Sequence, residues 1–135
     1  MIKETPIGVN IYRSFTDKMD VLESQHLIND CESAPYDWRL SLEDILAGGK
    51  QTGDRISYLA ATSTPYIEQE LRRLASTSRT GKVTIVAHSN GGLVGKALMR
   101  TLGATTTQQL IDTVIFVASP QAGTPAALAA LMHGH

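Results

Sequence analysis

One stretch, VTIVAHSNGGLVGKA (residues 83–97), constrains the fold more than any other part of the chain. It opens with an apolar run, Val83–Ala87, which predicts a buried strand, passes through a short polar turn, and continues as a helix over residues 93–102. A second apolar run, TVIFVASP (Thr113–Pro120), follows. Continuous runs of this kind are typical of parallel strands buried on both faces. The order strand, helix, strand therefore predicts an α/β fold with a parallel sheet.

Weaker patterns precede this unit. We expect a helix over Thr16–Asn29, with Met19, Leu22 and Leu27 toward the core, and a helical turn over Leu42–Leu46. The segment Ala47–Asp54 carries three glycines and no apolar anchor, which predicts a mobile loop. A further helix is expected after Thr64-Pro65, a pattern typical of a helix start. Its apolar stripe is Ile67, Leu71 and Leu74.

The polar turn between the strand and the helix has two interpretations, a phosphate cradle or a nucleophile. A P-loop has Gly, four residues, then Gly-Lys-Ser/Thr; here Gly95-Lys96 fit, but the first glycine position is Asn90 and the hydroxyl position is Ala97. A nucleophile turn has small-x-Ser-x-Gly between strand and helix, and residues 87–91, AHSNG, supply it. The sequence favours the nucleophile. A serine that only caps the helix stays as the alternative.

The nucleophile interpretation makes geometric predictions. Ser89 should adopt a strained, positive φ, which functional sites tolerate. Ala87 and Gly91 should be small because the strand and helix backbones pass closely at those positions. The residue after the nucleophile, Asn90, should offer its backbone N–H to an oxyanion.

Three blocks in a fixed order carry a family resemblance: APYDWRLS (34–41), KVTIVAHSNGGLVGKAL (82–98) and TVIFVASPQAGTP (113–125). Together they resemble the lipases and acyltransferases of the lecithin–cholesterol acyltransferase group of α/β-hydrolases. In that family a Tyr-Asp-Trp-Arg strand precedes the nucleophile, and a Pro-x-x-Gly-Thr/Ser-Pro loop follows the next strand. The resemblance implies a doubly wound parallel sheet of the α/β-hydrolase type.

The same resemblance assigns roles to individual residues. It makes Ser89 the nucleophile and Asn90 a donor to the oxyanion. It places the tetrad Tyr36, Asp37, Trp38 and Arg39 in the wall of the substrate site, although a buried aromatic plug with an Asp–Arg pair is an equally open interpretation of the tetrad.

The implied activity is hydrolysis of carboxylic, lipid-like esters by a serine esterase or lipase through an acyl-enzyme, with no metal and no cofactor. An acyltransferase that uses the same acyl-enzyme is one alternative. A non-catalytic scaffold or interaction fragment is the other.

The catalytic acid and base are not evident. The family order is Ser, then acid, then His, and only ten residues follow Pro125. Asp112 precedes its strand and so should lie at the wrong end, while His133 and His135 are weak candidates for the base. We therefore expect residues 1–135 to be a single, partial α/β-hydrolase domain, truncated at both ends and holding the nucleophile-elbow half.

The other histidines are expected to have different roles. His88 should have a structural role in the turn rather than a catalytic one, and His26 should be a surface residue of a helix. Because an unassisted serine hydroxyl is a weak nucleophile, we expect almost no esterase activity from the isolated chain. We also expect self-association through an exposed sheet edge.

The charge and composition of the chain limit the classes of partner that we expect it to bind. The formal net charge of −1 offers no basic surface for nucleic acid. No apolar run approaches the ~20 residues of a membrane span, and the first residues do not resemble a signal peptide. The expectation is a soluble protein, cytoplasmic by default. With Cys31 as its one cysteine, the chain forms no internal disulfide.

Overall fold

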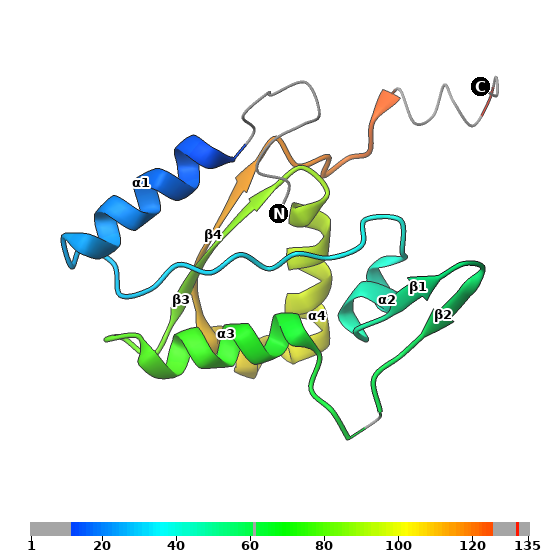
Figure 1. The fold of residues 1–135 in the computed structure, drawn as a ribbon, viewed down its shortest axis with the longest axis horizontal. Coiled ribbons are helices and arrows are strands. Elements are labelled where there is room, and N and C mark those ends of the chain that lie inside the picture. The colour runs from blue at the N-terminus through cyan, green and yellow to red at the C-terminus, as the bar shows by residue number, and fades with distance from the viewer. Residues whose placement is uncertain (1–11, 61, 126–131, 133–135) are drawn as a thin grey trace.

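The computed structural model describes residues 12–60, 62–125 and 132, which form a mixed α/β fold with two two-stranded sheets (Figure 1). The elements in chain order are α1 (Arg13–Ser24), α2 (Leu42–Leu46), β1 (Lys50–Thr52), β2 (Arg55–Ser57), α3 (Tyr66–Thr77), β3 (Val83–His88), α4 (Gly91–Leu110) and β4 (Ile111–Val117).

The parallel pair of β3 and β4 forms the centre of the fold. The register runs from Val83 opposite Ile111 to His88 opposite Val117, with an irregularity after Val83. Helix α4 connects the two strands and packs on both. The predicted strand–helix–strand unit, with adjacent parallel strands, is therefore confirmed.

Helices α3 and α4 cover the same face of this pair. Leu71 of α3, Leu98 of α4 and Ile111 of β4 are buried together, and Val83, Ile85 and Val114 pack against them. Leu71 belongs to the predicted apolar stripe, whose other members, Ile67 and Leu74, are half-buried. The burial of Leu71 and of Leu98 contributes roughly 1.5–3 kcal/mol each.

The opposite face of the pair is open in the described part of the chain. Val86, Ile115 and Val117 are each about 45% exposed. The expectation of strands buried on both faces is therefore wrong for the residues described. The physical reason is that both packed helices lie on one side. In Figure 1, α1 lies on the other side of the strands, but it contributes no buried residue.

A second core cluster joins α2 to α4. Leu40, Ile45 of α2 and Val94 of α4 are buried together. The predicted helical turn Leu42–Leu46 is confirmed, and Ser41 explains its start because the hydroxyl accepts a hydrogen bond from the Asp44 N–H at 3.1 Å.

Gly103 interrupts α4. Its φ of 76° and ψ of 164° are non-helical, and a second helical segment continues to Leu110. The predicted helix end at Gly103 marks this kink. A conformation of this kind is essentially restricted to glycine.

Other sequence expectations are corrected. The segment Ala47–Asp54 is not a loop throughout: it contains β1, which pairs antiparallel with β2. The turn of this hairpin uses Gly53 at a φ of 60°, and a three-residue strand is too short to show an apolar alternation in the sequence.

Helix boundaries also differ: α1 begins at Arg13 rather than Thr16, and α4 begins at Gly91 rather than residue 93. Helix α1 ends at Ser24 rather than Asn29 because His26 adopts a φ of 56° in the turn that follows. His26 is exposed, as expected, but it is not helical. Leu27 is 68% exposed and does not belong to the core. Helix α3 begins at Tyr66, one residue later than expected, and Pro65 rather than Thr64 precedes it.

Over the described ranges, no helix combines the length and the apolar character needed to cross a membrane.

Candidate functional site

Ser89 sits at the junction of β3 and α4 in a left-handed conformation, with a φ of 52°. Two backbone hydrogen bonds fix it: its N–H donates to the Val117 carbonyl at 2.9 Å, and its carbonyl accepts from the Gly92 N–H at 3.0 Å. For a non-glycine residue this backbone costs about 1–3 kcal/mol and persists only where the surroundings hold it. The predicted positive φ is confirmed, and Ser89 lies at the carboxyl edge of the parallel pair, where open α/β sheets place their sites.

Asn90 is the N-cap residue of α4 and directly precedes Gly91. Its φ of −54° and ψ of −27° are already helical, and its carbonyl accepts from the N–H groups of Leu93 and Val94 at 3.0 and 3.2 Å. Its side chain does not cap the helix, and within the described ranges no hydrogen bond of the Ser89 hydroxyl is found either. The serine therefore does not act as a helix cap. Free N–H groups at a helix start, together with the helix dipole, favour negative charge.

Tyr36 reaches this turn from a distant part of the chain. A Cβ built on Gly91 would lie 3.6 Å from the Tyr36 hydroxyl oxygen. Desolvation raises the pKa of Tyr36, a hydrogen bond with the Asn90 side chain partly opposes this, and Tyr12 adds to the increase. Tyr36 is thus the member of the tetrad that contacts the nucleophile turn.

The rest of the tetrad lies at the surface. Arg39 bends back onto Asp37, with Nε donating to Oδ1 at 2.8 Å, and this hydrogen bonding lowers the pKa of Asp37 to about 2. Trp38 is 72% exposed, so the alternative of a buried aromatic plug is wrong, although its Asp–Arg pair is present. The family's strand is not formed here either: residues 31–37 lie outside any sheet, and the backbone turns at Trp38 and Arg39.

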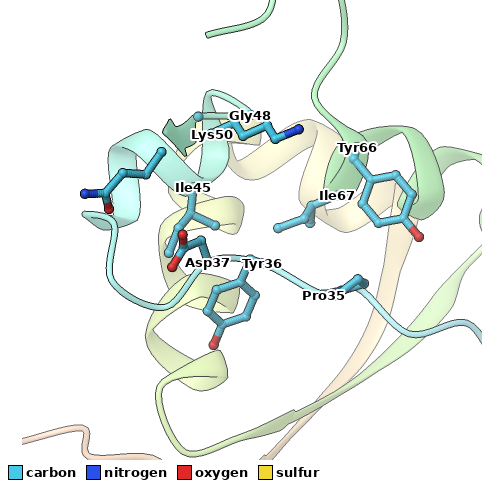
Figure 2. Close-up of a pocket in the computed structure, with 10 residues that line it drawn as sticks. Pro35, Tyr36, Asp37, Ile45, Gly48, Lys50, Tyr66 and Ile67 are labelled. Atoms are coloured by element: carbon cyan, nitrogen blue, oxygen red, sulfur yellow. The ribbon is translucent and has the colours of Figure 1, made fainter. Parts of the chain in front are cut away.

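An open pocket of about 310 Å³ adjoins Tyr36 (Figure 2). It lies between the Pro35–Asp37 segment, α2, the start of β1 and the start of α3, and its apolar walls include Ile45 and Ile67. In Figure 2 the Tyr36 ring borders the pocket while its hydroxyl is directed toward the first turn of α4. Ser89 does not line this pocket, so Tyr36 is the residue that connects the pocket with the turn at Ser89.

The sequence predicted that the chain packs closely at Gly91, but in the structure the close contact is at Gly92. A Cβ on Gly91 would make an ordinary contact, whereas a Cβ on Gly92 would overlap the Ser119 Oγ and lie 2.5 Å from the Ser119 Cβ. Ala87, the other position expected to be small, is buried, with 6% of its surface exposed. The reason for the difference is that the loop after β4, rather than β3 itself, packs against the helix start.

His88 is held by a residue that sequence reasoning missed. The Tyr12 hydroxyl lies 2.8 Å from His88 Nδ1, and the two rings meet edge to face at 5.6 Å. Tyr12 is 76 positions away in sequence, and no sequence signal connects it to the turn. Ser119 was also missed, although it stands in the third block of the resemblance, directly before Pro120.

Candidates for the acid and the base are not brought to Ser89 within the described ranges. Asp112 lies beside Val83 and Thr84 in the register, roughly 18 Å from Ser89 along the strands, and its carboxylate accepts from the Thr113 hydroxyl at 3.1 Å. The prediction that Asp112 lies at the wrong end is confirmed. His133 and His135 fall outside the described residues. Across the described part of the chain, no cluster of three or more potential metal ligands is present.

Comparison with known proteins identifies a family without an assigned function. The chain belongs to the family described as a domain of unknown function (DUF7379), which matches residues 59–133. The matched region includes α3, β3, the turn at Ser89, α4 and β4, and it leaves out the tetrad. No curated protein and no solved structure gives a significant match.

Proposed function

We propose that Ser89 is the nucleophile of a serine esterase or lipase that acts on carboxylic, lipid-like esters. The observation that supports this most strongly is the left-handed Ser89 between a parallel strand and a helix, with its backbone held on both sides. In this proposal β3, α4 and β4 are the central part of a doubly wound sheet of the α/β-hydrolase type.

The chemistry would be acyl transfer. Ser89 Oγ bonds to the ester carbonyl carbon, its proton passes to an imidazole base, and the carbonyl oxygen becomes an oxyanion that accepts from the Asn90 N–H. Collapse breaks the bond to the alcohol oxygen, which takes the proton and leaves. Water then attacks the acyl-enzyme in the same way, releases the acid and restores Ser89.

We propose a base other than His88, because the hydrogen bond that the described residues show for the His88 ring joins it to Tyr12 and not to Ser89. His133 and His135, or a partner chain, are the sources we propose. The apolar walls of the pocket beside Tyr36 support an apolar acyl or alcohol group as part of the substrate, with Tyr36 between that group and the reacting carbonyl.

The experiment is fluorophosphonate labelling of the purified chain, with and without added imidazole as an external base. We expect slow labelling of Ser89, located by peptide mass spectrometry, that imidazole accelerates by at least ~10-fold, because the base rather than the turn limits the reaction. Turnover of a short-chain chromogenic ester, after subtraction of the hydrolysis that imidazole catalyses on its own, should show the same acceleration. Ser89→Ala should abolish both signals, whereas Ser63→Ala, which removes an exposed hydroxyl in a turn, should leave them unchanged.

Labelling that persists in Ser89→Ala would contradict the nucleophile role, as would a Ser89 that stays unlabelled with and without imidazole. Fast labelling of Ser89 that imidazole does not change would instead show that the purified chain supplies the base itself. Turnover that shifts from free acid to a new ester when an alcohol is added would instead identify the acyltransferase alternative.

A further inference from the structure

Ser119 packs very closely against the start of α4. A Cβ on Gly92 would overlap the Ser119 Oγ, lie 2.5 Å from the Ser119 Cβ and lie 3.0 Å from the Phe116 Cδ1. Elsewhere in α4 the space is larger: a Cβ on Gly95 or Gly103 meets nothing within 4 Å. The tight packing is therefore local to the first turn of the helix, next to the loop that follows β4.

The same side chain also contacts the strand on the other side of the turn. The Ser119 hydroxyl donates to the Ala87 carbonyl at 3.4 Å. Ala87 precedes Ser89 by two residues, and Gly92 follows it by three. One residue thus touches both arms of the turn that carries Ser89.

The chain leading to Ser119 is itself held in place. Val117, at the end of β4, accepts the Ser89 N–H at 2.9 Å, and Ala118 adopts a left-handed φ of 49° that directs the chain toward the helix. A left-handed residue therefore directly follows each of the two neighbouring strands. The second of these turns places Ser119 against the first.

We propose that Ser119 is a positioning residue for the nucleophile turn: by filling the space beside Gly92 and bonding to Ala87, it fixes the distance between the end of β3 and the start of α4. A left-handed serine relaxes unless both its flanks are fixed. A change at this contact therefore moves the Ser89 hydroxyl and the Asn90 N–H, although Ser119 touches neither. This inference rests on the proposed nucleophile role of Ser89.

The test uses a compensating pair of substitutions. Gly92→Ala adds a methyl group where Ser119 stands, and Ser119→Gly removes the side chain that fills this space. Each alone should slow imidazole-assisted fluorophosphonate labelling of Ser89 by about 10-fold or more, because displacements of about 1 Å cost up to ~100-fold in rate. The double variant Gly92→Ala/Ser119→Gly refills the space but lacks the hydrogen bond to Ala87. It should label within about threefold of the unmodified chain, because at 3.4 Å this bond is long and the packing contact carries most of the positioning.

Two control variants accompany the pair. Gly95→Ala adds a methyl group to the same helix without a neighbour and should label at the original rate. Gly92→Ala/Ser119→Ala should stay slow, because the Ser119 Cβ alone is 2.5 Å from the added methyl. All rates are measured well below the melting temperature of every variant, so that a lower stability does not itself reduce labelling.

A second measurement separates this inference from the proposed function. The amide resonances of Ser89 and Asn90 in two-dimensional NMR spectra should shift in each single variant and return in the compensating double variant. If the unmodified chain does not label, the nucleophile role fails while the resonances still test the positioning. Single variants that label normally, or resonances that do not move, would overturn the role of Ser119. If Gly92→Ala does not fold, Ser119→Gly and the double variant decide the question.

Discussion

Replacing Ser89 with glycine should stabilise the protein, although it removes the proposed nucleophile. The φ of 52° disfavours every L-residue at this position, and glycine adopts it freely. The serine side chain contributes no hydrogen bond within the described ranges that would be lost on substitution.

The magnitude follows from two opposing terms. The left-handed backbone costs an L-residue about 1–2 kcal/mol, and glycine removes this cost. The greater freedom of glycine in the unfolded chain lowers the free energy of unfolding by about 0.5–1 kcal/mol. The net expectation is a gain of about 0–1.5 kcal/mol in the free energy of unfolding, and a gain of about 1 kcal/mol raises the melting temperature by about 4 °C for a domain of this length.

Thermal melts and urea denaturation followed by circular dichroism would measure the change. Ala118→Gly, at a φ of 49°, should stabilise by a similar amount, whereas Arg100→Gly, at an exposed position in α4, should destabilise by about 0.8–1 kcal/mol. If Ser89→Gly lowers stability as Arg100→Gly does, the turn at Ser89 is not strained and the argument for its functional role loses its basis.

Two further predictions concern the backbone at Gly103 and the ion pair at Asp37. Gly103→Ala should lower the free energy of unfolding by about 1–3 kcal/mol from backbone strain alone, since the added methyl meets nothing within 4 Å. Gly95→Ala has the same space but no positive φ and should not lower it. Equal effects of the two variants in urea denaturation would refute the strain argument. Arg39→Gln should raise the pKa of the Asp37 carboxyl from about 2 toward 3.8 in an NMR titration. Because the folded pKa is the lower one, the stabilising contribution of this pair is present above pH 3.8 and is lost as the pH falls toward 2; an unchanged titration would contradict the role of Arg39.

The parts of the fold that the sequence predicted well are those governed by local patterns. The apolar runs of β3 and β4 and the helix between them needed no knowledge of distant contacts, and the small-x-Ser-x-Gly pattern was enough to predict the positive φ of Ser89. The helical turn Leu42–Leu46 was also predicted, and the structure adds Ser41 as the residue that caps it.

The parts that sequence reasoning missed depend on contacts between segments far apart in the chain. Nothing near Tyr12 indicates its bond to His88, and nothing near Gly92 indicates that Ser119 rather than β3 occupies the adjacent space. The exposure of Trp38 shows the same limit: aromatic character predicts burial on average, but the side chain is buried only where another element comes to cover it.

Helix α4 takes part in both buried clusters, Val94 in one and Leu98 in the other, and Leu46 and Ile67 pack against both. Opening either cluster therefore disturbs the other, so α4 and the two parallel strands should behave as one cooperative unit in hydrogen exchange. The hairpin of β1 and β2, whose strands contribute no buried residue, should exchange through separate, smaller openings. The strained turn at Ser89 is thus attached to the part of the described chain that opens last, and it can keep its conformation while the hairpin side of the pocket fluctuates.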